Sequence, residues 1–464
     1  MRHLTFFLII VASCMACSKE SFLNQKPDQG HLVPSKLTDL QAILDQDQYM
    51  NGAAFSGGGP IPALGEIAAD SYYVLDQDFF RLPEVYRNAY VWNKDIFVAG
   101  MKPIDWDLPY QSIFYANVVL DNLATMNFND GESSLFNNVK GSALFYRAHA
   151  FYQLAQVFAP PYDPQKATEL LGIPLRLTAD VGERIYRSSL DAVYKRIADD
   201  LQEALKYLPD FPLVKTRPSK WAAYGLLARV YQTMLDYPQA ELYADKYLDV
   251  KNDLLDFNSL DSTASYPFAN LNNEEIAFAC NMLGLGASNY PLWHSYYALV
   301  DSALYKQYHT DDLRKYVQFK RTDRGVVYKG SYEGTDVNFA GIATDEVMLI
   351  KAECLAERGE VEQGLIVLNR LLETRFKEGS YIPYIANNQT EALDIIKSER
   401  RKELLFRGLR WTDIRRYNLE GDNIRLQRNV DGKEYVLEPN NARYTYPIPM
   451  EVLSFYEDME QNTR

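Results

Sequence analysis

Histidine and cysteine are scarce in this 464-residue chain, which has 5 His and 4 Cys. The histidines follow no ligand-like spacing, which disfavours both a zinc centre built from histidine and a His-based catalytic triad. The few cysteines argue against a disulfide framework, because a secreted scaffold uses a denser, even set. Basic residues are outnumbered, 48 Lys and Arg against 62 Asp and Glu, and this net charge of -14 disfavours nucleic-acid binding. Beyond the amino-terminal region no segment has the ~18 uninterrupted apolar residues of a membrane-spanning helix, so we expect the body of the protein not to cross a bilayer.

Aromatic residues are abundant instead, with 34 Tyr, 22 Phe and 5 Trp. Their flat apolar faces and polar edges suit contacts with sugars or peptides, although most of them must fill a core. The apolar share of 47% and the charged share of 24% are those of a folded protein with one large domain or a few smaller ones.

The amino terminus predicts export and a lipid anchor. Leu4 to Ser13 form an apolar run of the length of a signal-peptide core, too short to span a bilayer. Small residues then precede Cys14 and Cys17, a pattern that resembles a bacterial lipoprotein signal, in which the first mature cysteine is acylated. By local sequence, Cys14 is the better match to such a site. Several acyl chains would anchor the protein firmly, since each buried CH2 contributes about 0.8 kcal/mol. An ordinary cleaved signal is the alternative.

Helical periodicity dominates the rest of the chain. In 221–250, apolar and small residues recur every three or four positions across a break at Asp236-Tyr237-Pro238, and 345–372 repeats this plan with Gly359 at the break. Segments 141–208 and 392–416 fit two more hairpins. We therefore predict a mostly α fold, a tetratricopeptide-like scaffold of about four helical hairpins that each bury a face on the next.

Two long irregular stretches, 51–110 and 251–344, interrupt this scaffold. Loops of this length are usually functional or disordered, and the aromatic content argues against disorder. Strand is minor, and the best candidate is a β-hairpin from Ile424 to Leu437 that turns at Asp431-Gly432. We expect a signal peptide at 1–16, a lipidated tether at 17–30 and a single globular domain at 31–464.

Motifs along the chain occur in an order typical of one family. The export signal is followed by Phe22-Leu23-Asn24-Gln25-Lys26-Pro27, then by 146–154 with Leu171-Gly172-Ile173-Pro174-Leu175, by 399–404 with 408–416, and by Tyr446-Pro447-Ile448-Pro449-Met450-Glu451. This set resembles the SusD/RagB family, the starch-utilisation-system type of surface lipoprotein in Bacteroidota. The chain departs from the family at its end, where Gln461-Asn462 lacks the Pro-Gly that usually follows. The resemblance favours Cys17 as the lipid site, because the Phe-Leu pair of the family normally lies at the corresponding distance after the lipidated cysteine.

The resemblance implies a binding protein with no catalysis of its own, no cofactor and no metal. Family members lie on the outer face of the outer membrane and form a hinged lid on a SusC-like TonB-dependent transporter. They capture an oligosaccharide, or in some members a peptide, and pass it to the transporter. Their repeat face packs on the transporter and the ligand lies on the irregular side, which here corresponds to loops 51–110 and 251–344. No nucleic-acid partner is implied.

Those two loops contain the candidate ligand residues, since a sugar ring needs exposed aromatic planes flanked by amide or carboxylate side chains. Trp293 is the leading candidate, because Gly284-Leu285-Gly286-Ala287-Ser288 and Pro291 mark an irregular, exposed segment. The other candidates, each of which could instead be a core residue, are Tyr290, Asn289, Trp92, Asn93, Tyr72 and Tyr73. Trp106 is expected to be structural, and Trp221 and Trp411 are expected in the core.

Charged clusters and enzyme motifs give weaker indications. The basic cluster at 400–416 favours interhelical ion pairs over a phosphate site. Asp311-Asp312 with Asp323 lack the regular spacing of a calcium loop, and Asp311-Asp312-Leu313-Arg314 is better interpreted as a helix boundary. A glycoside hydrolase with two carboxylates is an alternative function, although no nucleophile motif is present. A repeat scaffold that binds only proteins is another.

Overall fold

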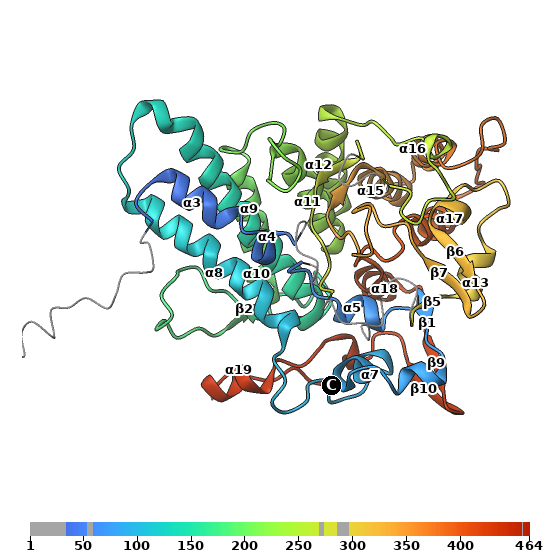
Figure 1. Cartoon of the computed structure of the whole chain (residues 1–464), viewed down its shortest axis with the longest axis horizontal. Helices are drawn as coiled ribbons and strands as arrows, with labels where there is room; N and C mark the ends of the chain where they lie inside the picture. The colour runs from blue at the N-terminus through green and yellow to red at the C-terminus, as the bar shows by residue number, and fades with distance from the viewer. Residues whose placement is uncertain (1–33, 53–58, 269–272, 285–296, 457) are drawn as a thin grey trace, which may run out of the picture.

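The computed structural model describes residues 34–52, 59–268, 273–284, 297–456 and 458–464, and helices form its framework (Figure 1). The α-helices of this part of the chain are α3 Leu37–Leu44, α4 Asp47–Met50, α5 Leu64–Ala68, α6 Asp76–Phe79, α7 Glu84–Tyr90, α8 Ile104–Thr125, α9 Ser133–Phe158, α10 Leu190–Ala204, α11 Lys220–Thr233, α12 Tyr237–Val250, α13 Ser302–Lys306, α14 Arg314–Val317, α15 Thr344–Glu357, α16 Val361–Glu373, α17 Gln389–Glu403, α18 Arg410–Glu420 and α19 Met450–Phe455. The strands are β1 Tyr72–Tyr73, β2 Leu171–Pro174, β3 Arg187–Ser189, β4 Ile276–Phe278, β5 Leu299–Val300, β6 Phe319–Thr322, β7 Gly325–Tyr328, β8 Ile342–Ala343, β9 Leu426–Val430 and β10 Lys433–Leu437. Within the described residues these strands form only antiparallel pairs.

Helical hairpins stack to form the scaffold. Helix α9 packs against both α8 and α10, α11 packs against α12, and α15 packs against α16. Helix α12 also contacts α15, and α17 contacts α15 and α16, so that consecutive hairpins cover one another. Figure 1 shows α11, α12, α15 and α16 along the upper side of the molecule. The predicted mostly α fold with a hairpin scaffold and a minor β-hairpin is confirmed.

Helix α8 begins inside the stretch that was expected to be irregular. It starts at Ile104, directly after Pro103, and contains Pro109 in its second turn. Proline is normally a signal that a helix ends, so the sequence pattern hides the true start. Helices α5 and α7 also lie in this stretch, but they have only 5 and 7 residues. Segments of this length are too short for a helical period to be recognised.

Glycine allows adjacent elements of the scaffold to approach closely. A Cβ atom at Gly225 in α11 would lie 2.6 Å from Cγ2 of Ile342 and 3.0 Å from Cδ2 of Tyr247 in α12. A Cβ atom at Gly141 in α9 would lie 2.9 Å from Cγ of Leu208. Since interiors are close-packed, any larger side chain at these positions would push the elements apart.

Buried ion pairs connect elements that are distant in the sequence. Arg314 pairs with Glu399 at 2.7 Å and with Glu403 at 2.8 Å, both on α17. Arg375 pairs with Glu403 at 2.8 Å and with Glu275 at 2.9 Å. Further pairs with at least one buried partner are Arg314–Asp312, Arg400–Asp413 and Arg416–Glu353, and Arg410 forms a half-buried pair with Asp70. The interhelical ion pairs predicted for the basic cluster at 400–416 are confirmed for Arg400 and Arg416. Arg410 pairs instead with Asp70, between α5 and β1, and Arg415 donates to backbone carbonyls.

The β-hairpin lies where its turn residues predict it. β9 and β10 pair antiparallel, with Val430 opposite Lys433. The two residues between them, Asp431 and Gly432, have φ angles of 49° and 74°. These positive angles at both central residues are those of the tight turn that Asp-Gly favours, because its twist matches that of the strands.

Candidate functional site

Two of the predicted ligand residues are buried in the core. Trp92 is 2% exposed, and its indole N–H donates a hydrogen bond to the carbonyl oxygen of Ala68 at 3.0 Å. Tyr72 is 3% exposed, and its hydroxyl donates to the carbonyl oxygen of Ile67 at 2.9 Å. The guanidinium of Arg428 lies 5.0 Å from the Trp92 ring and 5.3 Å from the Tyr72 ring. The expectation that these rings are open to a ligand is therefore wrong, because they pack around Arg428 and their polar groups are satisfied internally.

Tyr73 and Asn93 are more accessible. Tyr73 is half-buried in β1, where it is opposite Leu299 of β5. Its hydroxyl lies against Gly325 at the start of β7, 3.2 Å from the position of a Cβ atom there. Asn93 is exposed, and its side-chain amide donates to Oδ1 of Asn88 at 2.8 Å. Both residues stay candidates for ligand contact.

The remaining predicted residues lie outside the described residues. These are the ligand candidates Asn289, Tyr290 and Trp293, and the two candidate lipid sites Cys14 and Cys17. The chain is described again from 297, immediately before β5, which pairs with β1. The roles of these three ligand candidates and two lipid-site candidates therefore stay predictions.

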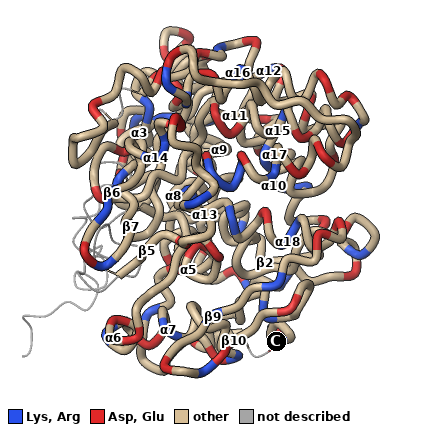
Figure 2. Tube along the Cα trace, turned by 90° about the vertical axis from the view of Figure 1, so that its right-hand side faces the viewer, with Lys and Arg blue, Asp and Glu red and all other residues tan. Residues whose placement is uncertain are grey.

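Short strands and turns from the two long loops form one surface, which we call the loop face: β1, β5, β6, β7 and residues 74–82. β5 pairs with β1 and contacts β7, and β6 pairs with β7. The Asp78 carboxylate is buried and accepts a hydrogen bond from Arg324, while Arg81 lies 3.6 Å from it. Next to this group Phe80 is 57% exposed. The loop face lies at the right of Figure 1, and Figure 2, which views that side, shows basic and acidic residues interspersed over it.

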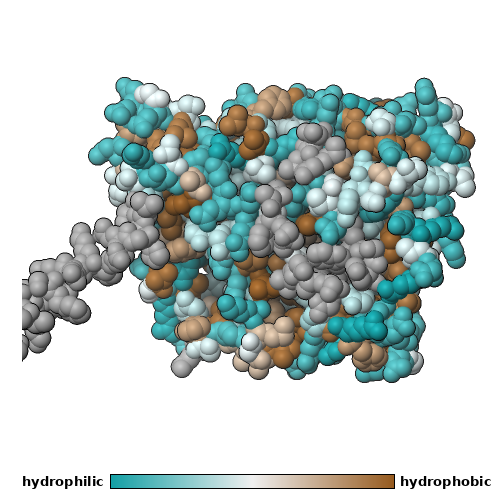
Figure 3. All heavy atoms as spheres, viewed as in Figure 1, coloured by the Kyte–Doolittle hydropathy of each residue, from teal (hydrophilic) through white to brown (hydrophobic). Residues whose placement is uncertain are grey.

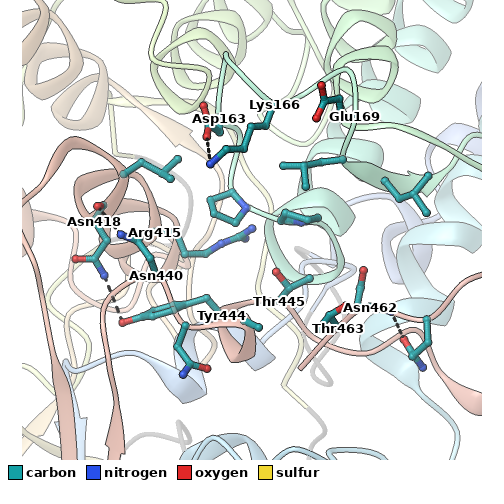
Figure 4. A pocket seen from close by; sticks show the side chains of 18 of the residues that line it. Asp163, Lys166, Glu169, Arg415, Asn418, Asn440, Tyr444, Thr445, Asn462 and Thr463 are labelled. Atoms are coloured by element: carbon teal, nitrogen blue, oxygen red, sulfur yellow. Dashed lines mark hydrogen bonds and ion pairs between the residues drawn. The ribbon is translucent and has the colours of Figure 1, made fainter.

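A polar cavity of about 570 Å³ lies between the end of α9, α18 and the carboxy-terminal segment (Figure 4). Much of its polar lining is already bonded to the protein. Arg415 and Asn462 donate to backbone carbonyls at the end of α9. Arg187 donates to the carbonyl oxygens of Leu171 and Gly172 and to Oδ1 of Asn462. These bonds tie the carboxy-terminal segment to the scaffold, which gives the cavity a structural role.

A second cavity, of about 560 Å³, is lined mainly by aromatic rings, and we call it the aromatic groove. It lies between α4, the first half of α8, residues 174–185 and the α19 region. Its rings belong to Tyr49, Trp106, Tyr110, Phe114, Tyr115, Phe455 and Tyr456. The sequence analysis missed this groove, because rings at 110 and 114 have the four-residue spacing of a core-facing stripe. Trp106 is 5% exposed, as expected of a structural residue.

The acidic residues considered for calcium do not form a site. In the part of the chain that the structure describes, no group of three or more His, Cys, Asp or Glu is arranged to hold a metal ion. Asp312 is buried and pairs with Arg314 at 2.8 Å. Helix α14 begins at Arg314, in agreement with the interpretation of this segment as a helix boundary.

Two family matches together span nearly the whole chain. Residues 21–232 match a family described as "Starch-binding associating with outer membrane", and residues 234–464 match the SusD family. The chain therefore belongs to the SusD/RagB family, and the resemblance noted in its motifs is confirmed. A curated relative, SusD-like protein P2 of Formosa agariphila, is 26% identical, and the alignment covers 96% of this chain and 95% of the relative.

Solved structures share the fold along almost the entire chain. A SusD superfamily protein from Bacteroides thetaiotaomicron has a TM-score of 0.74 at 19% identity, covering 92% of this chain and all of its own. A putative sugar binding protein from Bacteroides vulgatus has a TM-score of 0.73 at 21% identity, covering 93% of this chain and 99% of its own. A laminarin binding SusD-like protein has a TM-score of 0.67 at 18% identity, covering 92% and 98%. At these identities the likeness establishes the fold.

In the described part of the chain, no helix is both long enough and apolar enough to cross a bilayer.

Proposed function

We propose that this protein is a cell-surface lipoprotein that captures oligosaccharides and delivers them to a SusC-like TonB-dependent transporter in the outer membrane. The observation that carries the proposal is the family match across residues 21–464, on a scaffold that presents a loop face. Relatives named as sugar binding and laminarin binding support a glycan as the ligand class. The protein acts by binding and release and has no catalytic step of its own.

The ligand binds at the loop face in this proposal. Trp293 and Tyr290 supply aromatic planes for the apolar faces of sugar rings, and Asn289 supplies an amide for their hydroxyls. Tyr73, whose strand pairs with β5, lies at the edge of the same face. Phe80 adds an exposed ring beside the Asp78–Arg324 pair. Aromatic planes next to amide and charged groups are the combination that a sugar requires, since each ring has apolar C–H faces and a rim of hydroxyls.

A lipid on Cys17 holds the protein beside its transporter. Two partners anchored in one membrane meet at a high effective concentration, so the protein can swing away from the transporter and return without being lost. The segment from 17 to 30 serves as the tether. The hairpin scaffold packs on the transporter and leaves the loop face for the ligand.

Incubation of the purified mature protein with oligosaccharide mixtures tests the proposed function. We expect one class of oligosaccharide to be depleted from solution with no new reducing ends. New reducing ends would identify a hydrolase instead. If nothing is depleted while a barrel protein is recovered from detergent-solubilised membranes, the protein would be a scaffold that binds only proteins. Trp293→Ala should reduce the depletion, and Leu213→Ala, an exposed residue of the α10–α11 connection, should leave it unchanged.

A further inference from the structure

The aromatic groove is separate from the loop face. The labels of α8, β2 and α19 lie left of centre in Figure 1, whereas β1, β5, β6 and β7 lie at its right, so the two regions are separated along the long axis. Figure 3 shows apolar residues interspersed with hydrophilic ones along the lower edge of the same view, where α19 lies. A ligand in the groove would therefore not compete with a ligand on the loop face.

The walls of the groove are fixed by hydrogen bonds. The Asn117 side chain on α8 donates to the carbonyl oxygens of Arg176 and Thr178, at 3.0 and 3.1 Å, which holds the 174–185 wall. The hydroxyl of Tyr110 donates to the carbonyl oxygen of Pro174 at 2.8 Å. The Arg176 guanidinium reaches the hydroxyl of Tyr456 at 3.3 Å, which connects this wall to the α19 region. Because the wall from α8 and the wall from 174–185 are bonded to each other, the groove needs little ordering when a ligand binds.

The aromatic rings of the groove contact one another and also leave part of their surface open to a ligand. Tyr49 and Tyr115 have ring centroids 5.1 Å apart with their planes at 43°, and Phe114 is 5.7 Å from Tyr115. All three side chains are half-buried, so part of each ring faces the groove. Phe455 in α19 is 82% exposed, so its ring is open to a ligand.

Polar groups also stand among these rings. The half-buried Asp107 and the exposed Gln111 both line the groove. Among the described residues Arg176 forms no ion pair, and its guanidinium donates to the hydroxyl of Tyr456 and to the carbonyl oxygen of Asp180. The groove thus offers an acceptor, an amide and a cation, which together match hydroxyl groups that both donate and accept.

We propose that the aromatic groove is a second saccharide site, which binds a neutral pyranose oligosaccharide. The rings of Phe114, Tyr115 and Phe455 face the apolar sides of the sugar, and Asp107 and Gln111 bond its hydroxyls. The volume of about 560 Å³ lies in the range of ligand sites. The proposal takes its ligand class from the proposed function, but it names a different place on the molecule. A second site would keep a long glycan on the protein while its end engages the loop face.

Calorimetric titration with maltohexaose, laminarihexaose and cellohexaose tests this proposal on the full mature chain. The Trp293→Ala variant is used as background, so that binding at the loop face is weakened. We expect residual binding of at least one hexaose, weakened roughly tenfold by Phe455→Ala or by Gln111→Trp, which fills the groove. Both altered residues are exposed, so these variants should fold normally, as circular dichroism and melting would show. Leu213→Ala, whose side chain is as exposed as Phe455, is the matched control.

The possible outcomes distinguish a failure of the second-site proposal from a failure of the proposed function. If Trp293→Ala abolishes all binding, or if the residual binding is unchanged by the groove variants, the groove is not a saccharide site and the proposed function stands. If Trp293→Ala has no effect while the groove variants abolish binding, the groove is a saccharide site and the loop face is not. If the wild-type chain binds no hexaose, and the groove variants lose only the transporter in a membrane pull-down, the groove is a protein-docking surface and this proposal is overturned.

Discussion

Replacement of Glu403 by glutamine should strongly destabilise the protein, because this carboxylate joins two buried arginines. Its Oε2 lies 2.8 Å from Nη1 of Arg314 and its Oε1 lies 2.8 Å from Nε of Arg375. Both arginines are fully buried and Glu403 is 1% exposed in its side chain. Burial alone would raise the pKa of Glu403, but Arg375 and Arg314 outweigh it and hold that pKa below its ordinary value. The glutamate is therefore charged at neutral pH, and its stabilising effect is lost only as the pH falls through the lowered folded-state pKa.

Removing one partner of a buried ion pair costs about 3–5 kcal/mol. Arg314 keeps Asp312 and Glu399 as partners and Arg375 keeps Glu275, so the loss here should lie at the lower end of this range. In a chain of this size Glu403→Gln should therefore lower the melting temperature at pH 7 by roughly 3–10 °C. The matched control is Lys377→Gln, which breaks the exposed pair with Asp311 at 3.1 Å. Exposed pairs contribute about 0–1 kcal/mol, so this variant should melt close to the wild type. Equal melting of Glu403→Gln and Lys377→Gln in differential scanning calorimetry would refute the reasoning.

Three other predictions concern the anchor, the two tryptophans and a buried acid. Cys17→Ala should move the protein from the membrane fraction to the soluble fraction; mass spectrometry that finds the acyl chains on Cys14 would contradict this assignment. Trp293→Ala should weaken glycan binding by roughly 1–3 kcal/mol with little change in melting temperature, whereas Trp92→Ala should cost about 3–5 kcal/mol of stability, because Trp92 is buried. If Trp92→Ala instead weakens glycan binding and Trp293→Ala lowers the melting temperature, Trp92 would be the ligand residue and Trp293 the core residue. Burial raises the pKa of Glu66 to about 8, so its folded form prefers the proton and stability is lost as the pH rises towards that value. Glu66→Gln should therefore raise the melting temperature at pH 8 more than at pH 5, and an equal change at both would show that Glu66 is already ionised in the folded protein.

Local sequence signals were sufficient for the scaffold. The hairpins at 221–250 and 345–372 show their period directly, and the Asp431-Gly432 turn needs only its own two residues. The ion pairs of Arg400 and Arg416 with Asp413 also follow from a dense cluster of opposite charges on helices. Each of these features depends on neighbours in the sequence, where a pattern can be recognised.

The candidate site depends on contacts between distant segments. Trp92 was expected at the surface because it lies in a predicted loop, but its indole bonds to Ala68 and its ring packs on Arg428, more than 330 residues away along the chain. The aromatic groove combines Tyr49, Tyr115 and Phe455, which no local pattern connects. Burial and site formation of this kind are decided by tertiary packing, so a single sequence does not contain the signal.

A structure of the mature protein with the oligosaccharide that it depletes from solution tests the central claim most directly. We predict intact saccharide against the loop face, with a sugar ring stacked on Trp293 and its hydroxyls within hydrogen-bond distance of neighbouring polar side chains. A cleaved product, or saccharide bound with the loop face empty, would contradict the account.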